Sequence, residues 1–206
     1  MIEALLLTLR VAIVAVVLGL LPGVLLGVWF ARSKSPFVLG VEALVMAPLV
    51  LPPVATGLVL LIAFSHLPYL QSLPFTWWAA SVAAAVMALP LIVSSVRTAV
   101  RGVDPELEAV ARTLGAGPFR VLRSITLPLS WRGIVAGGLL AFCKAIGEFG
   151  ATMVVAGNIP GRTRTLALGI YTYSETGQDQ MAMVFVGASA LLAFAILLLA
   201  RRIDRA

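Results

Sequence analysis

The chain has 206 residues, of which 61% are hydrophobic and 12% are charged, and its mean hydropathy is +1.05. Soluble domains carry about 45–50% apolar and about 25% charged residues, so this composition excludes an ordinary soluble fold, a coiled coil and a disordered tail. A net charge of +6 would suggest a nucleic-acid partner for a soluble protein, but in a membrane protein it can simply report which loops face the cytoplasm. Single Cys143 and His66 residues exclude an internal disulfide and a histidine-rich metal cluster.

Five apolar stretches are long enough to cross a bilayer, which takes about 20 residues. The first is followed directly by Arg32 and has no basic n-region, so we interpret it as an anchor and not as a signal peptide. The second contains Pro48, Pro52 and Pro53, which predict a kinked or broken helix. We therefore expect an all-α integral membrane protein in which one domain covers residues 1–206. The five expected spans are residues 11–31, 38–64, 77–96, 133–157 and 181–200.

The basic residues predict the orientation of these spans. With the N-terminus outside, only Arg10, Arg162 and Arg164 lie on the outer side, and the inverted topology would violate the positive-inside rule almost everywhere. We therefore expect about five transmembrane helices with the N-terminus outside and the C-terminus in the cytoplasm. The inner side then holds Arg32, Lys34, Arg97, Arg101, Arg112, Arg120, Arg123, Arg132, Arg201, Arg202 and Arg205.

Glycines recur inside the first and fourth spans, where small residues let helices approach closely. We interpret them as helix-packing positions. They are Gly19, Gly23, Gly27, Gly133, Gly137 and Gly138.

The cytoplasmic loop over residues 97–132 carries strong helix signals. Asp104 suits the N-cap, Pro105 the first helical position and Gly115 the left-handed position after the C-cap, which predicts a short helix over about residues 105–114. A second short helix is expected from Pro118 until Leu127 and Pro128 end it.

The first of these helices is predicted to be amphipathic. Leu107, Val110, Ala111 and Leu114 form one apolar stripe, while Glu108 and Arg112 form an i, i+4 pair on another face. Such a helix can lie in the membrane interface as a loop filler or insert its apolar face into a groove on a soluble partner. Periodicity alone leaves both interpretations open.

The same segment resembles the EAA loop of importer-type ABC-transporter permeases, whose pattern ends in Gly, nine residues and Ile-x-Leu-Pro. Gly115 followed by Ile125-Thr126-Leu127-Pro128 matches this part in full. The front half departs from the pattern, since Ala109 stands where the family has Glu and Glu108 is displaced by one. The resemblance implies a coupling helix that docks into a separate ATPase subunit. The docking residues it implies are Asp104, Leu107, Glu108, Val110, Ala111, Arg112, Leu114 and Gly115.

Four further strings make nearly the whole chain, about residues 5–203, similar to the permease subunits of molybdate transporters. They are PLVLPPVATG (48–57), ARTLGAG (111–117), GEFGATM (147–153) and NIPGRTRT (158–165). The resemblance implies a type I importer permease fold and a homodimeric transporter of molybdate, with tungstate or sulfate as the alternative, in the cytoplasmic membrane of a prokaryote. It also implies an ATP-binding ABC subunit and an external oxyanion-binding protein as partners.

No phosphate-binding loop of the form G-x-x-x-x-G-K-[ST] occurs in the chain. We therefore expect that this subunit is not an enzyme, that it binds no cofactor and no metal, and that ATP and Mg²⁺ are held by the partner ATPase. A membrane-embedded enzyme would need a nucleophile and base or a metal cluster in the spans. An autonomous channel or secondary carrier would not need the amphipathic coupling segment.

Two opposite charges, Lys144 and Glu148, are expected within the fourth span, where ionisable groups usually face the bundle interior or water. One interpretation is a self-neutralising pair that makes insertion tolerable. The other places Glu148, flanked by Gly147 and Gly150, at the translocation pathway or its gate, with Lys144 nearer the cytoplasm. Cys143 is expected to be a small buried residue.

The outer side of the membrane is expected to carry few specific features. His66 is expected at the interface and not as a ligand, and a short helix is possible near residues 166–173. Arg162 and Arg164 could attract an oxyanion or meet an acidic patch on a delivery protein, or they could be solvated charges.

Overall fold

The computed structural model describes residues 1–33 and 35–204, and within these ranges the regular structure is helical throughout. Four helices are long and apolar enough to cross a membrane, and a bent pair can supply a fifth span. This architecture confirms the expected all-α membrane fold. The helices are α1 (Ile2–Arg32), α2 (Pro36–Val50), α3 (Pro53–His66), η1 (Pro68–Leu70), α4 (Trp77–Arg101), α5 (Pro105–Thr113), α6 (Pro118–Val121), η2 (Leu122–Thr126), α7 (Leu127–Ile146), α8 (Gly150–Ala156), α9 (Leu166–Glu175) and α10 (Asp179–Asp204).

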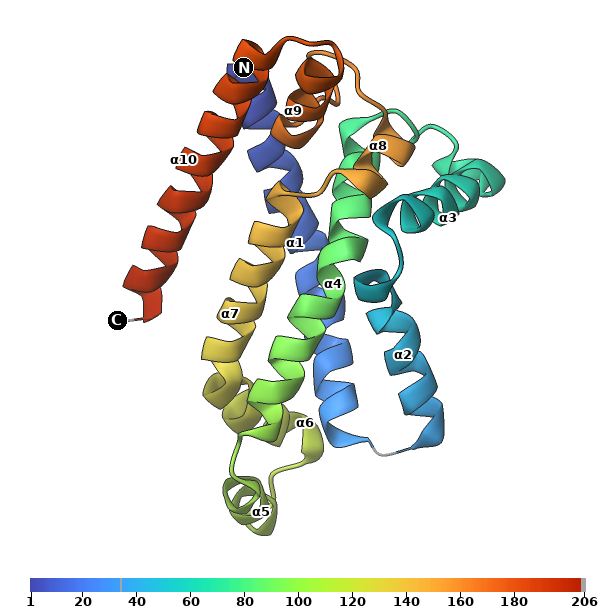
Figure 1. Cartoon of the computed structure of the whole chain (residues 1–206). Helices are drawn as coiled ribbons and strands as arrows, with labels where there is room; N and C mark the ends of the chain where they lie inside the picture. The colour runs from blue at the N-terminus through green and yellow to red at the C-terminus, as the bar shows by residue number, and fades with distance from the viewer. Residues whose placement is uncertain (34, 205–206) are drawn as a thin grey trace.

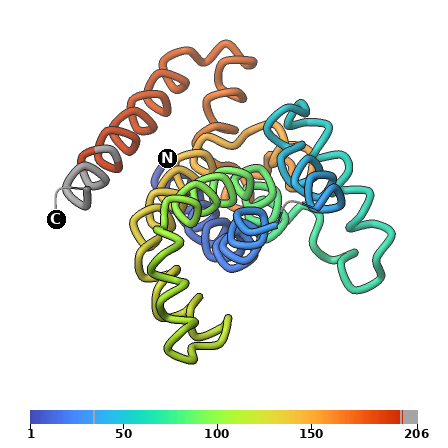
Figure 2. Tube along the Cα trace, turned by 90° about the horizontal axis from the view of Figure 1, so that it is seen from below, coloured from blue at the N-terminus to red at the C-terminus, as the bar shows by residue number. Residues whose placement is uncertain are grey.

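Three long helices, α1, α4 and α7, run side by side through the centre of the molecule (Figure 1). The inward face of α4 is dominated by alanine, and this lets its neighbours approach closely. α10 stands on one flank, where it packs mainly on α9, and α2 with α3 stands on the other (Figure 2). The central three helices therefore form the frame that positions the other elements.

The second span is broken, as its prolines predict. α2 and α3 meet at a bend of 117° around Leu51 and Pro52. α3 then packs against α8 so closely that a Cβ added to Gly57 would lie 2.8 Å from the carbonyl oxygen of Ala151. The broken span is thus fixed to the segment that follows α7.

The prediction of one continuous helix over residues 133–157 is wrong at both ends. Helical structure already begins at Pro118 and continues through the π-helical η2 into α7, so Pro128 does not end a helix. Pro128 lies directly after the π-helical turn, in which the Leu127 N–H donates to the Leu122 carbonyl, and a π-bulge of this kind shifts the helix hydrogen bonds next to the residue that lacks an N–H. α7 stops at Ile146, and α8 begins separately at Gly150. The break occurs because Gly147 is a weak helix former and Glu148 turns its side chain toward the backbone of α8.

The two ends of the molecule have different character. The N-terminus, α8 and α9 lie at one end, and α5 lies at the other with the C-terminal ends of α1 and α4 (Figure 1). The basic residues Arg32, Arg101 and Arg112 belong to the α5 end, which is therefore the cytoplasmic end by the positive-inside rule. The short helix α9, at Leu166–Glu175, confirms the one expected near residues 166–173.

Candidate functional site

The cytoplasmic helix α5 forms where the sequence predicts it, with both of its ends capped. The Asp104 carboxylate accepts a hydrogen bond from the Glu106 N–H at 2.9 Å. At the other end Gly115 adopts φ +85°, and the N–H groups of Gly115 and Ala116 donate to the carbonyls of Arg112 and Ala111. These two bonds form a Schellman motif, which only a residue tolerant of positive φ allows at position 115. Leu114 is the C-cap, so the helix ends one residue earlier than predicted.

The apolar stripe of α5 faces away from the rest of the molecule. Leu107, Val110 and Leu114 are 49%, 58% and 82% exposed, and Ala111 is half-buried. Leu107, Val110 and Leu114 thus form an exposed apolar surface on α5. An exposed apolar stripe on a helix can insert into a groove on another protein or lie in the membrane interface.

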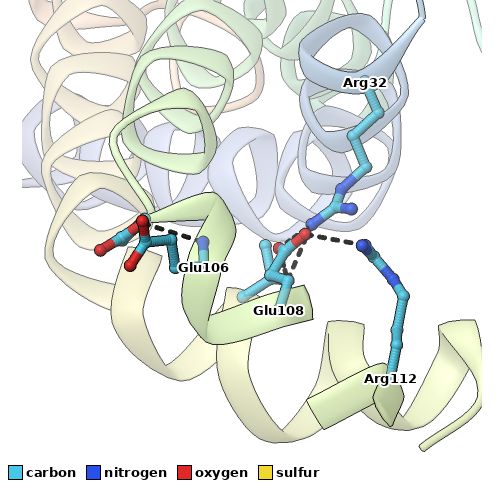
Figure 3. A network of polar contacts seen from close by, with 6 residues as sticks. Arg32, Glu106, Glu108 and Arg112 are labelled. Carbon is cyan, nitrogen blue, oxygen red and sulfur yellow. Dashed lines mark hydrogen bonds and ion pairs between the residues drawn. The ribbon is translucent and has the colours of Figure 1, made fainter. Parts of the chain in front are cut away.

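Another face of α5 carries a buried carboxylate, Glu108, which is 8% exposed (Figure 3). Its Oε1 atom forms an ion pair with Arg32 at the end of α1 and accepts a hydrogen bond from the Thr126 hydroxyl at 2.6 Å. Its Oε2 atom lies 3.1 Å from Arg112 Nη2, which confirms the expected i, i+4 pair. Glu108 therefore joins α5 to α1 and to η2.

These contacts set the charge of Glu108. Burial alone would raise the pKa of its carboxyl group, because burial disfavours the charged form. Hydrogen bonds from Arg32 and Thr126, together with the positive charges of Arg32 and Arg112, outweigh burial and leave the pKa below the ordinary glutamate value. The carboxylate is therefore ionised at neutral pH.

Lys144 and Glu148 do pair, but they do not share a helix. Lys144 lies in the last turn of α7, while Glu148 lies in the break before α8. Lys144 Nζ is 3.1 Å from Glu148 Oε2, and the Ala151 N–H donates to Glu148 Oε1 at 3.1 Å. The Glu148 side chain is only 2% exposed, whereas that of Lys144 is 34% exposed.

The glycines beside this pair have different surroundings. Gly147 is exposed in the break, and Gly150 begins α8 so close to α3 that an added Cβ would lie 2.9 Å from the Cβ of Pro53. Cys143, expected to be buried, is exposed because it lies on a side of α7 away from α4 and α1, where nothing in the described part of the chain covers it.

The ion pair between Glu42 of α2 and Arg97 of α4 was not predicted from the sequence. Both side chains are largely buried, and the pair holds α2, which has one buried residue, Val38, against α4. The sequence does indicate that Glu42 needs a partner, because a lone carboxylate within an apolar stretch is costly unless it is paired. Its partner lies 55 residues away and could not be identified from spacing.

On the outer side, Arg10 places its guanidinium 3.6 Å from the ring centroid of Trp77. Arg164 donates through Nε to the Asn158 amide oxygen at 2.9 Å, and Arg162 is exposed. Arg164 thus has a structural partner within its own loop, so of the two arginines expected to attract an anion only Arg162 projects from the loop.

Known proteins similar to this chain place it in a transporter family. The family model described as "Binding-protein-dependent transport system inner membrane component" matches residues 23–206. The molybdenum transport system permease protein ModB of Escherichia coli (strain K12) is 39% identical over 207 aligned positions, which cover 95% of this chain and 90% of the relative. The putative molybdenum transport system permease protein YvgM of Bacillus subtilis (strain 168) is 35% identical over 200 positions, covering 93% and 88%.

The fold has solved counterparts as well. An inward-facing structure of the MetNI methionine ABC transporter superposes with a TM-score of 0.80 over 99% of this chain and 94% of that chain, at 21% identity. An amino acid ABC transporter crystallised with histidines gives a TM-score of 0.64 at 18% identity. These identities support the fold alone, which is that of type I ABC importer permeases. The chain belongs to the family of inner-membrane components of binding-protein-dependent transport systems.

Proposed function

We propose that this chain is the permease subunit of an ABC importer that moves molybdate across the cytoplasmic membrane. Two copies form the translocation pathway. Each copy docks an ATPase subunit through the exposed apolar surface of α5, formed by Leu107, Val110 and Leu114, which we call the docking surface. ATP and Mg²⁺ are held by the ATPases, and an external binding protein delivers the anion. The proposal is supported by the similarity to molybdenum permeases over nearly the whole chain.

The single observation that carries the docking role is the division of α5 into two faces. Its apolar residues Leu107, Val110 and Leu114 are exposed, while Glu108 on the other face is buried against the spans. A helix that merely lay in the membrane interface would not need the buried Glu108 to fix its orientation. In the proposed mechanism, ATP binding draws the docked helices together, and the spans alternate between inward- and outward-open states that differ by only a few kcal/mol.

The docking role is tested by Leu107→Asp and Leu114→Asp. A carboxylate placed in an apolar contact should cost at least about 2 kcal/mol of binding free energy, roughly a thirtyfold loss of affinity for the ATPase. Co-purification of the ATPase and ATP-driven uptake should both fall. Gln180→Asp is the matched control, because it adds the same charge to an exposed position at the opposite end of the molecule. If both docking variants keep the ATPase and the uptake, the docking assignment is wrong.

We also propose that the break between α7 and α8, with Lys144, Gly147, Glu148 and Gly150, forms part of the gate of the pathway. The proposal is supported by the cost of placing charges within the membrane and by the 34% exposure of the Lys144 side chain. Glu148 contacts Lys144 and the α8 backbone, so its role in the gate is to hold the lysine and the helix start and not to contact an anion.

Glu148→Gln tests the gate. Glutamine keeps an acceptor for the Ala151 N–H but loses the ion pair, so the transport rate or the basal ATPase rate should change by about fivefold while the complex stays assembled. Cys143→Ala is the control, since it changes the exposed residue next to Lys144, leaves the ion pair intact and should stay near the wild-type rates. Unchanged transport and ATPase rates in Glu148→Gln would mean that the Lys144–Glu148 pair only makes membrane insertion tolerable.

A further inference from the structure

Apolar packing does little to hold α5 against the membrane spans. An open cavity of about 620 Å³ lies between α5 and the cytoplasmic ends of α1 and α4, lined by Ala31, Val100 and Val103 together with Arg32 and Glu108. The apolar residues of α5 point the other way, into the docking surface. Some other interaction must therefore fix the position of α5.

Glu108 provides this interaction. Among the described residues, it makes every side-chain hydrogen bond that joins α5 to α1 or to η2. The contact to α1 is an ion pair with Arg32, and the contact to η2 is the 2.6 Å hydrogen bond from Thr126. Apart from these bonds, α5 packs only on α6 and η2 among the described helices with which it shares several contacts, and the short chain segments at its two ends connect it to the spans.

The three side chains form a closed polar triangle in which the donors and acceptors match. Arg32 Nη2 donates to the Thr126 hydroxyl oxygen at 2.8 Å, and the same hydroxyl donates its single hydrogen to Glu108. Thr126 is fully buried and is the last residue of the π-helical η2, which leads directly into α7. π-Helical turns of this kind occur frequently at functional sites. The triangle therefore connects α5 with the ends of two spans at once.

We propose that Glu108 is a positioning residue that clamps α5 to α1 and α7, so that movement of the docking surface is transmitted to both spans. This inference rests on the proposed function, because it assumes that an ATPase moves α5. It assigns Glu108 to contacts within the permease and not to the contact with the ATPase, since its side chain is buried against Arg32 and Thr126, whereas the residues of the docking surface are exposed.

The test uses Glu108→Ala and Thr126→Val in the complex of permease, ATPase and binding protein in proteoliposomes. Both variants should still bind the ATPase, because the docking surface is intact. Glu108→Ala should lower the molybdate taken up per ATP hydrolysed by about tenfold, equivalent to about 1.4 kcal/mol of coupling free energy, and Thr126→Val should give a smaller loss. Glu106→Ala is the matched control: it removes the same charge two residues away, from a side chain that points away from the clamp (Figure 3).

The distance between α5 and α7 can be measured directly, without a transport assay. Spin labels at Thr113 of α5 and Leu129 of α7, both exposed, are introduced in a Cys143→Ala background. The wild-type clamp predicts a narrow distance distribution with and without ATP, whereas Glu108→Ala should broaden it and Glu106→Ala should not.

The outcomes separate the clamp from the proposed function. A narrow distribution in Glu108→Ala overturns the clamp, even if uptake per ATP falls. Weaker ATPase binding in Glu108→Ala, with an unchanged ratio of uptake to hydrolysis in the complexes that still form, overturns it too and returns Glu108 to the docking contact. A distance distribution that broadens in Glu108→Ala but not in Glu106→Ala supports the clamp. If wild-type complexes then hydrolyse ATP but take up no molybdate, the clamp stands and the proposed substrate is rejected.

Discussion

Among single residues, the sequence predicts the one local partner of Glu108, Arg112, but not its two distant partners. Arg112 follows from helical spacing, whereas Arg32 and Thr126 lie 76 and 18 residues away and meet Glu108 only when α1, α5 and η2 assemble. The partner of Glu42, Arg97, could not be predicted for the same reason, since it lies 55 residues away. A buried carboxylate can be recognised as needing partners, but their identity depends on the tertiary fold.

The charge of Glu108 should make the position of α5 sensitive to acid. Because its folded pKa lies below the ordinary glutamate value of 4.5, the ionised carboxylate stabilises the folded state fully above that value and loses this effect as the pH falls through the lowered pKa. Hydrogen exchange of α5 amides in detergent should therefore show unchanged structural protection from pH 7 to about 5, after correction for intrinsic exchange rates, and a loss of protection only below about 4.5.

Glu108→Gln serves as the control for this acid response. Glutamine does not titrate, so the variant should start with weaker protection of α5 and show no further loss that depends on residue 108. An identical acid transition in Glu108→Gln and in the wild type would show that another group controls the position of α5.

At the scale of elements, local chemistry explains which predictions hold. α5 forms as predicted because Asp104 and Gly115 act within a few residues of the helix. The second span breaks as predicted because its prolines remove helix hydrogen bonds. The break after α7 was missed because the apolar pattern continues through residues 147–157, and only the contact of Glu148 with Ala151 and the packing of α8 on α3 reveal it.

Two adjacent glycines of α7 give a matched test of helix packing. A Cβ added to Gly137 would lie 2.9 Å from the Cβ of Ser95 and 3.3 Å from the Cα of Ile92, whereas one added to Gly138 would find its nearest atom at 3.9 Å, on Leu20. Gly137→Ala should therefore push α7 from α4 and cost about 1–3 kcal/mol. Gly138→Ala should be neutral or stabilising by up to about 1 kcal/mol, because alanine favours the helix.

Thermal unfolding of the two purified variants in the same detergent measures this difference. Gly137→Ala should have the lower midpoint and Gly138→Ala a midpoint at or above that of the wild type. Equal midpoints would mean that α4 and α7 do not pack as closely as the structure shows.

For the whole molecule, the net charge of +6 reflects the orientation of the chain in the membrane more than the binding of an anionic ligand. The described basic residues near α5 mark the cytoplasmic end, and the outer arginines Arg10 and Arg164 are engaged with Trp77 and Asn158. The large exposed apolar surface of α1, α2, α3 and α10 suits lipid or further subunits. Composition and charge pattern thus predict the class and topology of the fold, whereas the bend of the second span by 117° and the contacts of α8 required the structure.

Uptake of radioactive molybdate into proteoliposomes tests the proposed transport function. The vesicles contain the permease and its ATPase, and the binding protein is added outside. The proposed function predicts accumulation that requires ATP inside the vesicles, the ATPase and the binding protein, and that falls in Leu107→Asp. Accumulation at the same rate without ATP or without the ATPase would identify an autonomous carrier or channel, and no molybdate accumulation with all components present would contradict the proposed substrate.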